Sequence, residues 1–145
     1  MSQLIKNYDP AYRSGAKINN SIARGSDVGT ANAVNVTATL TAQQVAEGYI
    51  TSTSAAAVTM TLPTGTLLGA QISAQQGTIL DLYIDNTAGL STVTIAVATN
   101  GILSDAAATT GASFGQLTVA SGATGIGRFT LMFSSATAYV FTRTA

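Results

Sequence analysis

Two carboxylates, Asp81 and Asp85, are the residues whose type and spacing come nearest to a catalytic pair. Histidine and cysteine are both absent, which excludes Ser-His-Asp triads, cysteine nucleophiles and metal sites built on those ligands. Carboxylate chemistry remains, and the paired groups of a glycosidase lie roughly 5–9.5 Å apart. Four residues of strand would separate Asp81 from Asp85 by about 13 Å. The spacing favours two solvated aspartates over a catalytic dyad, unless another strand supplies a partner.

Two other stretches resemble functional motifs but lack the required context. GATGIG, from Gly122 to Gly127, resembles a phosphate-binding loop, yet it lies between two strand patterns rather than before a helix, which indicates a turn. DNTAG, which begins at Asp85, does not match a calcium loop. The sequence therefore predicts no catalytic residue, no metal site and no cofactor, and a protein that is not an enzyme. The least favoured alternative is a hydrolase that uses Asp81, Asp85 or Glu47.

Charge is scarce and unevenly distributed. Of the 145 residues 8% are charged, with six basic and six acidic side chains and a net charge of zero, whereas about 25% is usual. Hydrophobic residues make up 46%, so the chain is expected to fold. Residues 1–30 carry four basic and two acidic side chains, a balance of +2, and residues 31–145 carry two and four, a balance of −2. Because +2 is weak for a basic binding patch, we expect no nucleic-acid partner.

The sequence gives no indication of a membrane-spanning helix or of a cleaved signal peptide. No apolar run reaches the roughly 18 residues of a transmembrane helix, so we expect no membrane partner. The opening stretch MSQLIKNYDPAYRSG lacks the apolar core of about 7–15 residues that a signal peptide needs. Synthesis in a cytoplasm, without export by a cleaved signal, is the expectation.

The change in composition near residue 30 predicts two parts, an extended N-terminal arm over residues 1–30 and a body over residues 31–145. The arm is rich in Asn, Ser and Gly and has no sustained apolar period, and a frayed terminus is the alternative. Aromatic residues next to basic ones are common at docking surfaces. The candidate contact residues of the arm are Tyr8, Tyr12, Arg13, Lys17 and Arg24.

The body alternates apolar and polar residues in the manner of β-strands. The strand-like stretches are VNVTATL, YITSTS, AAVTMTLP, TILDLYIDN, STVTIAVA, QLTVA, IGRFTLMFS and TAYVFTRTA, the last two forming a predicted hairpin. In TILDLYIDN the alternation places Leu82 inward and Asp81, Tyr83 and Asp85 outward. About eight strands with frequent turns predict an all-β fold, an antiparallel β-sandwich or jelly roll.

Two short helices are expected between the strands. In TAQQVAEG, Thr41 and Gln44 fit a capping box and Gly48 fits a helix stop. TGTLLGAQISAQQG has apolar residues at helical spacing and predicts the second helix.

The outward positions of the strands are mostly Thr, Ser and Ala, and lysine is absent after Lys17. Lysine commonly protects sheet edges, and a chain of near-zero net charge tends to self-associate. Such a surface is either hydrated by its hydroxyl groups or covered by partners.

The body resembles virion proteins of tailed bacteriophages. The resembling stretches are TLTAQQVAEGYITSTSAAAVTMTLPT, LDLYIDNTAG, STVTIAVA and GRFTLMFSSATAYVFTR, and from the first to the last they span roughly three quarters of the chain. They are similar to head decoration, or cement, proteins, and the resemblance implies small β-rich trimers on the outer capsid surface. Such trimers clamp neighbouring capsomers together, and an N-terminal arm often reaches over capsid subunits.

Composition and resemblance together predict a virion structural protein, made in a host cytoplasm and located on the outside of a phage capsid. Its expected partners are the major capsid protein and further copies of itself, in a homo-oligomer that is expected to be a trimer. The alternative is a trimeric receptor- or glycan-binding domain of a tail fibre or head fibre.

Overall fold

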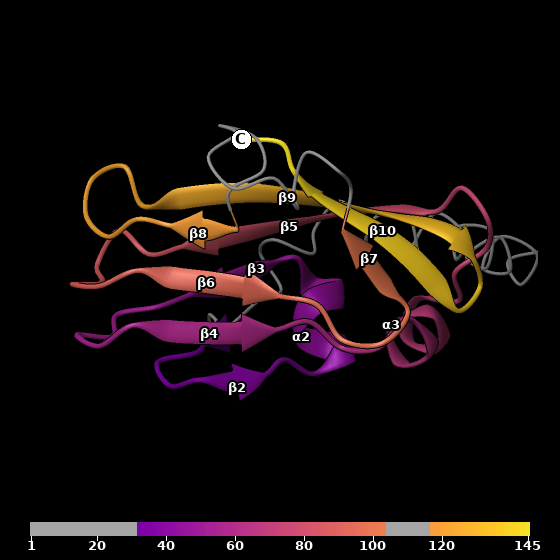
Figure 1. Cartoon of the computed structure of the whole chain (residues 1–145), viewed down its shortest axis with the longest axis horizontal. Coiled ribbons are helices and arrows are strands. Elements are labelled where there is room, and N and C mark those ends of the chain that lie inside the picture. The colour runs from indigo at the N-terminus through magenta and orange to yellow at the C-terminus, as the bar shows by residue number, and fades with distance from the viewer. Residues whose placement is uncertain (1–31, 104–116) are drawn as a thin grey trace, which may run out of the picture. The chain divides into compact units, whose positions relative to one another are not determined.

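The computed structural model describes residues 32–103 and 117–145, which belong to one compact unit, residues 31–145. Their strands form two sheets, and two short helices lie at one end of the strands (Figure 1). The six-stranded sheet has the order β1 (Asn32–Ala33), β3 (Tyr49–Thr51), β5 (Ile79–Asp85), β9 (Ile126–Ser135), β10 (Ala138–Arg143) and β7 (Gly101–Leu103). The four-stranded sheet has the order β2 (Ala38–Thr39), β4 (Val58–Thr61), β6 (Val93–Ala96) and β8 (Thr118–Val119).

From β1 to β8 the chain alternates between the two sheets, so that strand pairs β1–β2, β3–β4 and β5–β6 form three successive coils. Neighbouring coils pair in parallel in both sheets, β1 with β3 and β3 with β5, and β2 with β4 and β4 with β6. Antiparallel pairing occurs where β9 joins β5 and β10, and where β8 joins β6.

The expected antiparallel sandwich or jelly roll is therefore wrong, because the sheets are mixed and much of their pairing is parallel. Inward and outward positions alternate with the same period in parallel and antiparallel strands, so the pattern could not reveal the direction of pairing. Parallel neighbours need a crossover connection. Here the crossover consists of the strand in the other sheet and, in the first two coils, a short helix.

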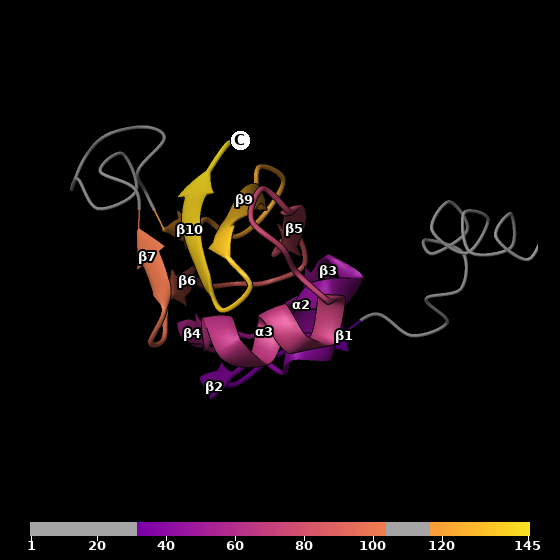
Figure 2. The same cartoon turned by 90° about the vertical axis from the view of Figure 1, so that its right-hand side faces the viewer.

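The two predicted helices are confirmed. α2 (Ala42–Glu47) begins at Thr41, whose side chain accepts a hydrogen bond from the Gln44 N–H while the Gln44 side chain accepts one from the Thr41 N–H. It ends at Gly48, whose left-handed φ of 80° suits glycine. α3 (Gly65–Ile72) is capped by Thr64, whose side chain accepts a hydrogen bond from the Leu67 N–H at 3.2 Å. The helices pack against each other at the ends of the coils (Figure 2).

The first predicted strand, VNVTATL, is not continuous. The chain leaves the six-stranded sheet after β1 and joins the four-stranded sheet at β2, so residues 34–37 form a corner between the sheets. Val34 is buried at this corner, whereas Val36 is 70% exposed. In a continuous strand these two valines would share one face, but a change of sheet resets the alternation. The predicted β9–β10 hairpin is confirmed.

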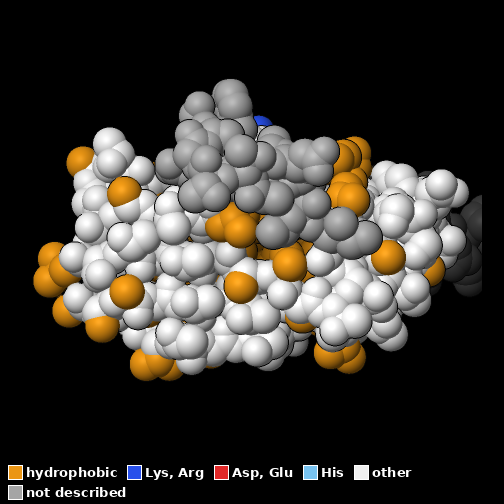
Figure 3. Space-filling model, in the orientation of Figure 1, with side chains coloured by type: hydrophobic (Ala, Val, Ile, Leu, Met, Phe, Trp, Pro, Cys, Tyr) orange, Lys and Arg blue, Asp and Glu red, His pale blue; other side chains and the backbone are white. Residues whose placement is uncertain are grey.

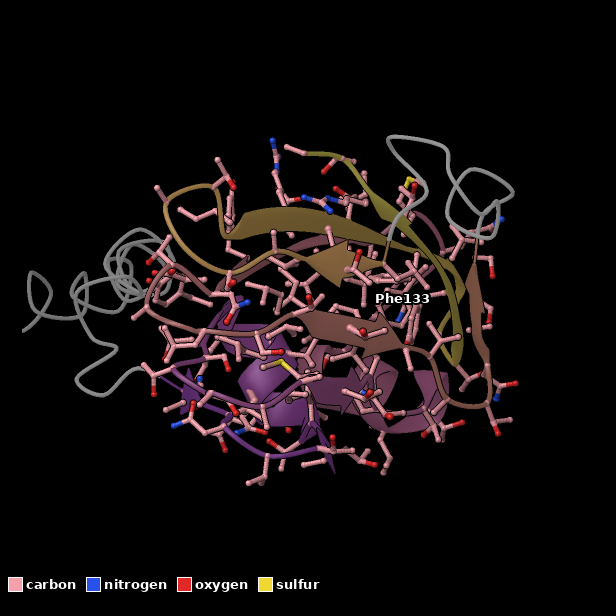
Figure 4. All side chains as sticks on the ribbon, turned by 60° about the vertical axis from the view of Figure 1, so that its left-hand side comes forward. Phe133 is labelled. Atoms are coloured by element: carbon pink, nitrogen blue, oxygen red, sulfur yellow. The ribbon has the colours of Figure 1, made fainter. Side chains whose placement is uncertain are left out.

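The apolar core lies between the sheets and under the helices. Phe129 stacks on Phe141 with ring centroids 5.2 Å apart, and Phe133, labelled in Figure 4, packs at a tilt against Tyr139. The core residues are Val34, Leu40, Val45, Ile50, Val58, Met60, Leu62, Leu68, Ala74, Leu82, Ile84, Val93, Ile95, Val119, Phe129, Leu131, Phe133, Tyr139 and Phe141.

Two buried polar side chains tie the coils to the strands that follow them. Asn86, directly after β5, donates from Nδ2 to the carbonyl oxygens of Ser91, Val119 and Ala120 at 2.8, 3.2 and 3.0 Å. The Tyr139 hydroxyl donates to the Pro63 carbonyl oxygen at 2.8 Å, and burial raises the pKa of Tyr139 to about 12. The bonds from Asn86 to Val119 and from Tyr139 to Pro63 each join residues more than thirty positions apart within the core.

Two glycines allow α3 to approach the turn of the β9–β10 hairpin closely. Gly65 and Gly69 lie one helical turn apart and are both buried. A Cβ atom at Gly69 would overlap the Ala136 carbonyl oxygen, and one at Gly65 would overlap that of Thr137. The obstacle is backbone in both cases, so it cannot move aside as a flexible side chain could.

We therefore expect Gly69→Ala to lower the free energy of unfolding by about 2 kcal/mol, although alanine in place of glycine normally stabilises a helix by about 1 kcal/mol. Thr66→Ala is the matched control, because Thr66 is exposed on the same helix, and it should change stability by less than about 0.5 kcal/mol. Urea unfolding measures both variants. A neutral or stabilised Gly69→Ala would contradict this packing.

Candidate interaction surfaces

The outer face of the six-stranded sheet gathers most of the charged and aromatic surface side chains in the described part of the chain. Tyr49 on β3, Tyr83 on β5 and Arg128 on β9 are register partners across three neighbouring strands. Asp81 and Asp85 lie on the same face of β5. These five residues are called the tyrosine–carboxylate face. Three apolar side chains, Ile79, Ile126 and Met132, are exposed beside them.

Asp81 is neutralised by groups on the neighbouring strand. Its Oδ2 accepts a hydrogen bond from Arg128 Nη2 at 2.7 Å, and its Oδ1 accepts one from the Thr130 hydroxyl at 2.8 Å. The bond from Arg128 is the main reason that the pKa of Asp81 is lowered. The Arg128 guanidinium carbon also lies 5.8 Å from the centre of the Tyr83 ring, within the range of a cation–π contact.

Asp85 is held by hydroxyl groups. Its Oδ1 accepts from the Thr87 hydroxyl at 2.6 Å and from the Thr87 N–H at 2.9 Å, and its Oδ2 accepts from the Tyr49 hydroxyl at 2.6 Å. The bond from Thr87 contributes most to lowering the pKa of Asp85, and the same Tyr49–Asp85 bond raises the pKa of Tyr49. The carboxylate therefore fixes the Tyr49 ring on the sheet surface.

This face offers charge, hydroxyl groups and rings to a ligand, and neither of its carboxyl groups is set up as a general acid. A general acid needs a carboxyl group whose pKa is raised, whereas the pKa values of Asp81 and Asp85 are both lowered. Within residues 32–103 and 117–145, no group of three or more His, Cys, Asp or Glu side chains is placed to hold a metal ion.

The outer face of the four-stranded sheet is a second surface, made of threonines and free of charge. Thr59, Thr94 and Thr118 are register partners across β4, β6 and β8, and Thr39 pairs with Thr61 across β2 and β4. Figure 3 looks onto β4 and β6 and shows white and orange side chains there without red ones.

An apolar groove of about 550 Å³ lies at the carboxyl ends of β2, β4 and β6, beside α2 and α3. It is called the helix groove. The residues that line it are Thr39, Leu40, Thr41, Ala42, Pro63, Thr64, Leu67, Ala70, Gln71 and Ala98. No charged residue is among them, and Leu67 at its border is 61% exposed.

The turns that precede β2, β4 and β6 form a fourth surface, called the turn edge: Val36, residues 55–57 and Leu90. Val36 and Leu90 are the two most exposed large hydrophobic side chains in the described ranges, at 70% and 77%. Residues 55–57 are three exposed alanines. Apolar side chains gather along the left margin of Figure 3, where these turns lie.

The structure settles part of what the sequence suggested about sites. Asp81 and Asp85 share one strand face as predicted, and Gly122–Gly127 begins as a turn. The arm candidates Tyr8, Tyr12, Arg13, Lys17 and Arg24 lie outside the described residues. Of the tyrosines in the described ranges, Tyr139 is buried.

Tyr49 and Tyr83, however, are neighbours. Neither this pair nor the position of Arg128 over Tyr83 was found from the sequence. The available signal was the repeated order of a Thr-Leu pair, a capping threonine and a helix at Thr39–Thr41 and again at Thr61–Thr64. It indicates equivalent coils whose strands lie side by side.

Comparison with family models, curated proteins and solved structures finds no match to this chain. Among the described residues, no helix has the length and apolar character needed to cross a membrane.

Arg128→Gln is expected to raise the pKa of Asp81 toward its ordinary value, because the main bond that favours the carboxylate is lost. Since the folded-state pKa lies below the unfolded value of about 3.9, this bond stabilises the fold above about pH 4, and the contribution disappears as the pH falls through the folded pKa. NMR titration of the Asp81 carboxyl carbon measures the shift. Arg143→Gln is the control, since Arg143 bonds the carbonyl oxygens of Thr118 and Ala145 instead, and an unchanged Asp81 pKa in Arg128→Gln would contradict the assignment.

Proposed function

We propose that this chain is a non-enzymatic structural protein of a phage virion, which binds the outside of the capsid as a homo-oligomer, expected to be a trimer, and stabilises the shell by bridging capsomers. The resemblance to decoration proteins supports this reading, as do the neutral surfaces of the body. The major capsid protein is the proposed partner.

The observation that carries the proposal is that all five charged side chains in the described ranges are engaged within the chain. Glu47 accepts hydrogen bonds from Asn32 and Gln43, Asp81 pairs with Arg128, Asp85 is bonded by Tyr49 and Thr87, and Arg143 bonds two carbonyl oxygens. Charges that already have partners do not need new ones when a surface is covered.

Such a surface is suited to broad contact with neutral protein. Burial of apolar area contributes about 25 cal/mol per Å², and the methyl groups of threonine and alanine supply this area without charge to desolvate. Each contact can be weak if one oligomer touches several capsomers at once, because the later contacts become intramolecular. The regular lattice of a capsid provides that repetition.

One observation favours the second candidate, a glycan- or receptor-binding domain of a tail or head fibre. Tyr49 and Tyr83 stand side by side, and Asp85 and Arg128 lie next to them. Exposed rings beside hydrogen-bonding groups can hold a ligand with apolar and polar faces. However, the carboxylates of Asp81 and Asp85 already accept hydrogen bonds from Thr130 and Thr87, which leaves them less available to a sugar.

Co-sedimentation with purified heads of the phage that encodes the chain tests the proposal. We expect the full chain to bind saturably and to raise the temperature at which the heads release DNA. A chain lacking residues 1–25 should remain a folded oligomer but lose head binding, because the arm supplies the proposed contacts. Replacing Arg13, Lys17 and Arg24 with serine is the milder variant and should weaken binding without altering the circular dichroism spectrum.

Each outcome decides one part of the proposal. Equal binding by the shortened chain would refute the arm as the contact. A full chain that ignores heads, and that selects one sugar on a glycan array, would favour the fibre domain instead.

A further inference from the structure

The turn edge and the helix groove lie at opposite ends of the strands of the four-stranded sheet. Because β2, β4 and β6 are parallel, the turns before them lie together at the amino ends of the strands, and the segments after them lie together at the carboxyl ends. Leu90 precedes β6 at the amino end, and Ala98 follows β6 in the groove at the carboxyl end. One copy of the chain thus presents a projecting apolar surface at one end and a concave apolar surface at the other.

The helix groove has few polar groups to orient a polar ligand. The Thr41 and Thr64 side-chain oxygens accept hydrogen bonds from the N–H groups of Gln44 and Leu67, at 3.1 and 3.2 Å, and so serve as helix caps. Sites for small molecules normally combine apolar walls with converging polar groups. With two of its hydroxyl groups engaged and no charge, the groove fits aliphatic side chains better than a polar metabolite.

The turn edge is ordered by hydrogen bonds between successive coils. The Leu90 N–H donates to the Ser54 carbonyl oxygen at 3.0 Å, and the Thr53 N–H donates to Asn35 Oδ1 at 2.7 Å. These bonds hold the turns that carry Leu90 and Val36 in fixed relative positions. A surface that is already ordered loses little conformational freedom on binding.

We propose that the turn edge of one copy, with Leu90 and Val36 in front, docks in the helix groove of a second copy. Neither surface carries a charge, so the contact leaves no charge buried without a partner. It joins two different surfaces and is therefore heterologous, and because these lie at opposite ends of the strands, repeated contacts extend as an open chain unless the rotation between copies closes a ring. The contact rests on the self-association proposed above but not on binding to a capsid.

Variants of the two surfaces test the contact in the absence of phage heads. Leu90→Glu and Leu67→Glu each place a charge on an exposed position of one surface, and each is expected to weaken self-association at least about tenfold in sedimentation velocity. An equimolar mixture is expected to form heterodimers, since Leu67→Glu keeps its turn edge and Leu90→Glu keeps its groove. Thr66→Glu is the matched control on α3, exposed but outside the groove, and should associate as the wild type does.

The other outcomes overturn the contact. The contact is refuted if either variant still self-associates as the wild type does. It is also refuted if the equimolar mixture stays monomeric, or if the wild-type chain is a monomer at high concentration. If Leu67→Glu loses its circular dichroism spectrum, Ala70→Glu replaces it, because Ala70 lines the groove and is exposed. A monomeric wild type that still binds heads would refute this contact and leave the proposal of shell binding intact. A self-associating chain that ignores heads would refute shell binding and leave this contact intact.

Discussion

Hydrogen bonds between successive coils fix the relative positions of the strands and turns that carry the surfaces described above. Beyond the ends of the strands, the Leu40 N–H still donates to the Thr61 carbonyl oxygen at 2.8 Å and the Leu62 N–H to that of Ala96 at 2.7 Å. Both sheets are built from the same coils, so a slip of one residue in either sheet would turn core side chains outward. Rows of threonines, stacked turns and adjacent helices are all consequences of this one register.

The two ends of the coil stack are finished differently. At one end Asn86 occupies the corner position that Ser52 holds in the coil before it, and its side chain bonds the backbone around β8 and β6 in place of a further coil. Antiparallel β9 then covers the edge of β5. At the other end β1 and β2 are only two residues long, and such short edge strands offer little backbone for unwanted pairing.

The sequence predicted local structure well and the connection between strands poorly. Alternation correctly placed Leu82 in the core and Asp81 and Asp85 outside, and the capping box of α2 was found residue by residue, because both depend on spacings of a few residues. Parallel pairing was missed since Tyr49 and Tyr83 become neighbours across 34 residues. Alternation describes only neighbouring residues and says nothing about pairing between distant strands. Only the repeated order of strand, capping threonine and helix indicated which strands pair.

The stacking of coils gives a physical reason for the scarcity of charge. Stacked coils bring equivalent positions of successive strands to about 4.8 Å from one another, so a charge repeated in each coil would face its own kind and destabilise the sheet. Threonine can occupy such a row at no electrostatic cost, as Thr59 and Thr94 do. Charge is tolerated where strands that differ in sequence meet, which is where Asp81 on β5 faces Arg128 and Thr130 on β9. Stacking coils in parallel therefore favours neutral sheet faces, and contacts made through those faces depend on shape and apolar area more than on charge.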